Sequence, residues 1–140
     1  MALTQGQCTI FKVNLLEGLE NFASGSTYVY KIALYTASAT LNADTLAYTT
    51  DNEVTGTGYT AGGEVLSPTT PTSNGSTAFV SFANVTWNPA SFTARGALIY
   101  NSTTGAAVAV LDFGADKTAT NTFTVTFPTA DASNAIIRIS

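Results

Sequence analysis

From residue 27 to the C-terminus, the chain is a succession of short apolar or alternating runs separated by glycine, proline and asparagine. The first run, TYVYKIALYT at 27–36, is rich in tyrosine and β-branched residues, which favour strands. Similar runs follow at 62–67, 77–87 (with a break near Asn84), 92–100, 106–113, 121–128 and 134–140. Short strands separated by turn residues are typical of a β-sandwich or jelly roll. We therefore expect an all-β fold, a β-sandwich/jelly roll of about seven or eight strands.

Only the segment TIFKVNLLEGLENF has helical periodicity. Its apolar residues recur every three or four positions: Phe11, Leu15, Leu19 and Phe22. This spacing predicts one N-terminal α-helix over 9–22, with Thr9 as a candidate N-cap and Gly25 just beyond its end. The apolar stripe either docks on its own domain or faces a partner. The second interpretation makes Phe11, Leu15 and Leu19 candidate partner-binding residues.

The length of 140 residues fits one domain, and no repeat or linker divides the chain. We predict a single domain over 1–140, with an N-terminal arm at 1–8, the helix at 9–22 and strands within 27–140. Residues 68–76 contain two prolines and an Asn-Gly pair, which predict a loop. The stretch 37–51 fits either an excursion with one helical turn or a further edge strand.

The chain carries little charge: 10% of its residues are charged, against a usual value of about 25%, and the net charge is −4. The basic residues are scattered along the sequence: Lys12, Lys31, Arg95, Lys117 and Arg138. Nucleic-acid binding needs clustered lysine and arginine, and an anionic membrane surface attracts the same clusters. We therefore expect neither nucleic acid nor a membrane as a partner. A surface so poor in charge suggests contact with other protein.

The residue types needed for most catalysis are missing. The chain has no histidine and one cysteine, Cys8, which removes Ser-His and Cys-His pairs and His/Cys metal clusters. We predict that the protein is not an enzyme, that it holds no cofactor or metal, and that Cys8 is a small, partly buried apolar residue. The N-terminus lacks the features of a signal peptide, and no apolar run approaches the roughly 20 residues of a membrane span. We expect cytoplasmic synthesis and departure only within a larger assembly.

The stretch NEVTGTGYTAGGEVLS, at 52–67, contains four glycines that invite comparison with a phosphate-binding loop. A dinucleotide fingerprint needs G-x-G-x-x-G before a helix, but here Gly62 comes one residue late and a strand pattern follows. No P-loop lysine follows either. These glycines are predicted to serve shape, as a tight turn with positive φ or close backbone approach that leads into strand 62–67.

Two acidic pairs invite comparison with catalytic and metal sites: Asp51 with Glu53, and Asp112 with Asp116. Asp112 begins a DFG triplet, but the kinase signature also needs a histidine-containing loop. Calcium usually takes about six to eight oxygen ligands, so two carboxylates are too few unless loops converge. Nothing in the sequence places either pair across a glycosidase cleft. A hairpin turn with solvated charges is the default interpretation for Asp112 and Asp116.

Arg95 stands within the otherwise apolar run FTARGALIY. A charge at this place either pairs with an acid at a sheet edge or contacts a partner, because arginine is favoured at protein interfaces. The candidate partner-binding set is therefore Phe11, Leu15, Leu19 and Arg95.

Five segments carry a family resemblance: YKIALYTASATL, NEVTGTGYTAGGEVL, FVSFANVTW, TARGALIYNSTTGAAVAVLDFGADK and FPTADASNAIIRI. Through them, almost the whole chain from the predicted helix onward resembles small structural proteins of tailed bacteriophages. Within that class it most resembles capsid cement (decoration) proteins. The resemblance implies a virion protein that is made in the host bacterial cytoplasm, binds the outer surface of the capsid lattice and stabilises contacts between major capsid protein subunits.

The alternative is a phage tail or fibre accessory module that binds virion protein or host-surface carbohydrate. Such a module would need an exposed aromatic platform, for which the candidates are Tyr28, Tyr30, Tyr48, Tyr59 and Trp87.

Self-association is also expected, with a dimer ahead of a trimer. The runs at 27–36, 92–100 and 106–113 carry few charges, whereas exposed sheet edges are usually protected by charge or proline. A partner should therefore cover at least one edge, and two-fold contacts are the commonest solution.

Overall fold

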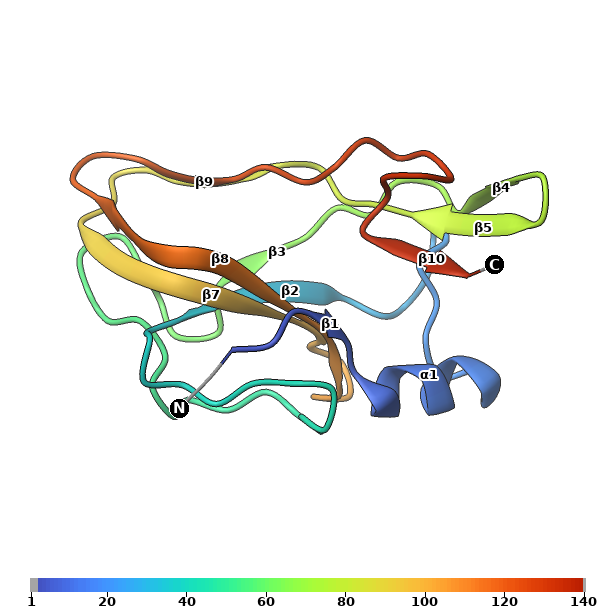
Figure 1. The fold of residues 1–140 in the computed structure, drawn as a ribbon, viewed down its shortest axis with the longest axis horizontal. Coiled ribbons are helices and arrows are strands. Elements are labelled where there is room, and N and C mark those ends of the chain that lie inside the picture. The colour runs from blue at the N-terminus through green and yellow to red at the C-terminus, as the bar shows by residue number, and fades with distance from the viewer. Residues whose placement is uncertain (1–2, 140) are drawn as a thin grey trace.

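The computed structural model describes residues 3–139 and contains one helix and three antiparallel sheets in that part of the chain (Figure 1). The helix is α1 (Thr9–Leu16). The strands are β1 (Gly6–Gln7), β2 (Tyr30–Tyr35), β3 (Glu64–Val65), β4 (Thr72–Asn74), β5 (Thr77–Val80), β6 (Val85–Trp87), β7 (Phe92–Asn101), β8 (Ala107–Ala119), β9 (Phe123–Val125) and β10 (Ile137–Ile139). The prediction of an all-β chain with one N-terminal helix is confirmed at this level.

The largest sheet has the strand order β1-β8-β7-β2-β3. Its three central strands are almost wholly buried: every residue of β2 except Lys31, every residue of β7 except Thr93 and Arg95, and the first five of β8. Burial on both faces explains why these runs read as continuously apolar rather than alternating. In Figure 1, β9 lies along one side of these strands and the segment between β2 and β3 along the other. These two layers shield the two faces of the central strands from water.

Two smaller sheets complete the fold, β10-β5-β4 and β6-β9. The β6–β9 ribbon contributes Trp87 and Phe123, whose ring centroids lie 6.0 Å apart and which both contact Phe92. A second aromatic contact joins Phe82, which precedes β6, to Phe127, which follows β9, with ring centroids 5.5 Å apart. Large buried rings of this kind supply much of the apolar area of a core.

The helix is shorter than the predicted 9–22, and this correction has a local cause. Gly18 has φ +75, and the N–H groups of Gly18 and Leu19 donate to the carbonyls of Leu15 (3.2 Å) and Asn14 (2.8 Å). This is the Schellman arrangement, in which a left-handed glycine ends a helix. Gly18, not Gly25, is therefore the stop signal. At the other end the N-cap position belongs to Cys8 rather than Thr9, and no side chain caps it.

Several predicted boundaries also change. The predicted loop 68–76 contains β4, which pairs with β5 through a two-residue turn whose first residue, Gly75, has φ +63, as a type II′ hairpin requires. The predicted strand 77–87 is divided into β5 and β6 by a gap that includes Asn84, as expected. The run 106–113 continues as β8 to Ala119. The stretch 37–51 forms neither helix nor strand and is joined to the fold by isolated bridges at Leu41 and Ala47.

The predicted N-terminal arm, 1–8, contributes β1, which pairs with β8. Residues 1 and 2 of that arm and residue 140 of the last predicted strand lie outside the described residues.

The glycine-rich stretch serves the shape role that its sequence predicts. Gly58 (φ +86) and Gly63 (φ +78) lie so close to neighbouring backbone that a Cβ would overlap the carbonyl oxygens of Pro89 and Ile32, respectively. The loop therefore rests directly on the backbone of β2 and of the turn before β7.

We predict that Gly63→Ala lowers the free energy of unfolding by about 3 kcal/mol or more, because the methyl group must displace the backbone of a buried strand. Gly25→Ala is the matched control, since Gly25 has φ +85 but a Cβ added there would have no heavy atom within 4 Å. It should cost only about 1 kcal/mol, the strain of the backbone alone. Urea unfolding followed by circular dichroism measures both, and equal losses would contradict the close approach.

Candidate functional site

Exposed apolar side chains gather around α1 and β10. Of the seven large apolar side chains that are exposed within residues 3–139, four lie on α1, just after it, or on β10: Val13, Leu16, Leu19 and Ile139. Leu16 is 90% exposed and Ile139 is 54% exposed. Contiguous exposed apolar surface is characteristic of contact sites, whereas single exposed apolar residues need no explanation.

Two hollows lie beside Leu16 and Ile139, and the linings of both include Leu15 and Ile139. One, of about 240 Å³, is lined mainly by apolar residues that include Phe11, Phe79 and Ile137. The other, of about 590 Å³, has a shorter lining: Gln7, Lys12, Leu15, Leu16, Arg138 and Ile139. Together they form the α1–β10 groove. Figure 1 shows α1 and β10 as neighbours at the end of the molecule where the C-terminus lies.

The groove follows from how β10 is paired. β10 is the outermost strand of its sheet and pairs with β5, with Ile137 opposite Val80 and Ile139 opposite Ala78. Ile137 and Ile139 are two residues apart and therefore point to the same face. The side chain of Ile137 is buried, whereas that of Ile139, at the end of the strand, is exposed to solvent. The short helix likewise leaves Leu16 at its last position without a neighbour to cover it.

Of the predicted partner-binding residues, Phe11 and Leu15 line the groove. Leu15 is half-buried there, whereas Leu19 lies outside the lining and is 44% exposed just beyond the end of the helix. Phe11 is fully buried and packs edge-on against Phe22, so its side chain belongs to the core and offers no exposed surface to a partner. Arg95 is not in the lining; it lies on β7, where its Nε atom is 3.4 Å from Oδ1 of Asp112.

Sequence reasoning missed Leu16, Ile139, Lys12 and Arg138. If Gly18 had been taken as the residue that ends the helix, Leu16 would have been identified as a residue of its last turn. No feature of the sequence near Ile139 indicates that its side chain is exposed.

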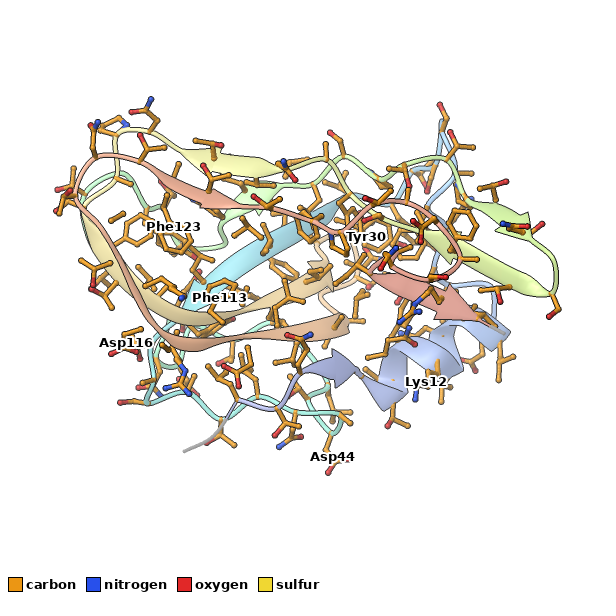
Figure 2. The ribbon with its side chains drawn as sticks, turned by 45° about the horizontal axis from the view of Figure 1, so that its top comes forward. Lys12, Tyr30, Asp44, Phe113, Asp116 and Phe123 are labelled. Atoms are coloured by element: carbon orange, nitrogen blue, oxygen red, sulfur yellow. The ribbon has the colours of Figure 1, made fainter. Side chains whose placement is uncertain are left out.

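Two of the three charged side chains that line the groove, Lys12 and Arg138, are basic. Lys12 is exposed, and within the described residues it takes part in no ion pair. Figure 2 shows Lys12 on α1, on the side of the molecule where β10 ends. Arg138 donates from Nη1 to the carbonyl of Ser133 at 2.6 Å. Hydrogen bonds from Asn134, and to a smaller degree the charge of Arg138, lower the pKa of the nearby Asp131.

The only acidic residue in the lining is Glu20, and it is turned into the protein. Its carboxylate accepts hydrogen bonds from Tyr30 Oη and Asn101 Nδ2, both at 3.0 Å, and is only 8% exposed. Burial raises the pKa of Glu20 above the ordinary value of 4.5, while these hydrogen bonds act in the opposite direction. Glu20 therefore links the chain after α1 to β2 and β7.

A second buried carboxylate, Glu53, holds the glycine-rich loop. It accepts hydrogen bonds from Tyr48 Oη at 2.6 Å, from Tyr59 Oη and from the backbone N–H of Gly62 at 2.8 Å. Burial raises the pKa of both tyrosines well above the ordinary value. All acceptor contacts of Glu53 are internal, and its predicted companion Asp51 is exposed, so the two carboxylates do not face a common cleft.

No metal site is formed within residues 3–139 by three or more His, Cys, Asp or Glu side chains. Asp112 is bound to Arg95 and accepts from the N–H of Gly114 at 2.9 Å, while Asp116 is exposed. Cys8 is fully buried, and burial raises the pKa of its thiol to about 11, so it stays protonated and unreactive near neutral pH. The one helix in the described part of the chain is too short to cross a membrane.

The aromatic platform expected of a carbohydrate-binding module is not formed by the predicted candidates. Tyr30 and Trp87 are buried, and Tyr28, Tyr48 and Tyr59 are half-buried. Tyr48 stacks on Tyr100 with ring centroids 4.7 Å apart, and Tyr59 stacks on Trp87. These ring faces are used for internal packing.

A scan against protein-family models, a search of curated proteins and a search of solved structures each found no significant match to this chain.

The buried Glu20 generates a prediction about pH. Because its pKa is higher in the folded state than in the unfolded chain, its stabilising effect is present below the unfolded pKa and is lost as pH rises through the folded pKa. Glu20→Gln retains an acceptor oxygen for Tyr30 and Asn101 but cannot ionise. The variant should therefore gain stability relative to the parent protein as pH rises from about 4 to about 8.

Urea unfolding at a series of pH values measures this difference, with Glu17→Gln, at an exposed position, as the matched control. A stability difference between Glu20→Gln and the parent that is independent of pH would contradict the assignment.

Proposed function

We propose that this protein is a bacteriophage capsid cement (decoration) protein that binds the outer surface of the capsid lattice and stabilises contacts between major capsid protein subunits. The observation that carries the proposal is the α1–β10 groove, where Leu16 and Ile139 are exposed beside a structured sheet. The resemblance of the sequence segments to small phage structural proteins gives the partner and its location. The finer fold assignment, a β-sandwich or jelly roll, belongs to the same proposal and is supported by the layers on both sides of the central strands.

A cement protein needs a rigid body with an adhesive surface. The central sheet supplies rigidity through the burial of β2, β7 and β8, and the groove supplies apolar area outside that core. Specific interfaces bury about 1,200–2,000 Å² in total, so the groove would form part of a larger contact. Many copies on one lattice add up to a large stabilisation even when each contact is modest.

The expectation of a homo-oligomer, a dimer ahead of a trimer, rested on exposed edges of three apolar strands. β2, β7 and β8 are instead internal strands of the five-stranded sheet, so their low charge reflects burial within the chain. This reasoning for self-association is therefore wrong, and the dimer stays a prediction without it. The alternative function, a tail or fibre module that binds carbohydrate, is disfavoured by the packing of the candidate aromatic rings.

We predict that antibodies against the protein, applied to purified virions and viewed by electron microscopy, label the head over its whole surface. A lattice-binding protein has many equivalent sites, whereas a tail module occupies one end of the particle. Label confined to the tail or to a single vertex would contradict the cement function and favour the alternative.

We also predict that Leu16→Asp weakens binding to capsids that lack the protein, because the variant loses the apolar contact of Leu16 and brings a hydrated charge into the interface. Leu46→Asp is the matched control: Leu46 is 66% exposed but lies outside the groove. Co-sedimentation of each purified variant with the capsids measures the bound fraction. Equal binding by the two variants would show that the groove is not the contact surface.

A further inference from the structure

We propose that the α1–β10 groove binds an extended segment of a different protein that is apolar and carries at least one carboxylate. Its apolar side chains would cover Leu15, Leu16 and Ile139, and its carboxylate would meet Lys12 and Arg138. These side chains define the chemistry of the partner that binds at the site of the proposed function. That the partner is a capsid subunit rests on the proposed function.

The charges of the groove select the partner. The chain has only five basic residues, and two of them, Lys12 and Arg138, line the same hollow, in which no acidic side chain is found. Lys12 has no ion pair within residues 3–139. Arg138 is bound to a backbone carbonyl, and its charge acts on the carboxylate of Asp131, which is not part of the lining of this hollow. Complementary charge at the rim of an apolar contact favours the correct partner and its orientation.

A second copy of the chain is a poor occupant of this surface. A two-fold contact places the same patch on both subunits, so the surface that carries Lys12 and Arg138 would meet a second surface with the same two positive charges. Juxtaposed like charges disfavour such a contact. Glu20 could not neutralise them, because its carboxylate is directed inward to Tyr30 and Asn101.

The geometry of β10 favours an extended segment. β10 is the outermost strand of the β10-β5-β4 sheet, and no further strand of the described chain pairs with its outer edge. An added strand could bond to this edge through its backbone and place alternate side chains into the groove beside α1. Such an edge next to exposed Ile139 is otherwise a liability for aggregation, which a partner strand would remove.

The test uses the isotope-labelled full chain and three synthetic ten-residue peptides of alternating valine and threonine that carry two Glu, two Gln or two Lys. Backbone amide resonances are followed by NMR during titration. We expect the Glu peptide to shift resonances of residues 12–19 and 137–139, to bind more tightly than the Gln peptide, and to weaken with added salt. The Lys peptide should not bind.

The double variant Lys12→Glu/Arg138→Glu should bind the Glu peptide about tenfold more weakly and bind the Lys peptide instead. Lys117→Glu is the matched control, because Lys117 is also an exposed lysine but lies on β8 outside the groove. It should bind the Glu peptide like the parent. The dispersion of the amide spectrum verifies that each variant is folded, and Leu16→Gln, which leaves the charges intact, should also weaken the Glu peptide.

Equal affinity for the three peptides, no binding of the Glu peptide, or shifts at other residues would overturn the inference. Shifts of residues 12–19 and 137–139 that depend on protein concentration without peptide would also overturn it, in favour of a second copy. Capsid binding that survives Lys12→Glu/Arg138→Glu would refute the inference and leave the cement function intact. Peptide binding by a protein that is absent from virion heads would contradict the cement function alone.

Discussion

The burial of three central strands on both faces is the constraint on which the rest of the structure depends. β2, β7 and β8 carry side chains such as Ile32, Leu98 and Val110 that are fully removed from water. A sheet of this kind needs a layer on each side. Residues 3–139 form one eight-residue helix, so the chain builds these layers from short strands and loops, which explains why so much irregular backbone lies against the sheet.

Loops can keep water away from a sheet only when their conformation is held in place. Hydrogen bonds to two buried carboxylates do this here. Glu53 gathers Tyr48, Tyr59 and the backbone of Gly62, while Glu20 gathers Tyr30 and Asn101. Burying a carboxylate is unfavourable unless hydrogen-bond donors replace its water. Because each carboxylate has several donors from separate segments, losing one donor would loosen the cover at more than one place.

The sequence predicts the strands better than it predicts the site, for a physical reason. The run 27–36 contains β2 and the run 92–100 matches β7 closely, because continuous apolar character follows directly from burial. The helix end was misplaced because the i, i+4 spacing continues past Gly18, whose left-handed conformation depends on local backbone bonds. Leu15 and Leu19 could be proposed from spacing, but the exposure of Ile139 depends on distant segments that happen not to reach it.

The exposed apolar side chains of the groove lie outside the core that holds the central sheet together. Burying a leucine or isoleucine fully contributes about 1.5–3 kcal/mol, so the exposure of Leu16 and Ile139 leaves that contribution unused in the free chain. Neither side chain belongs to the core cluster. Substitutions here should therefore change binding while leaving folding nearly intact, whereas substitutions at Glu20, close to the same groove, should change folding first. This surface is apolar and partly basic, and the core does not depend on it. Contact with another molecule explains why such side chains are exposed.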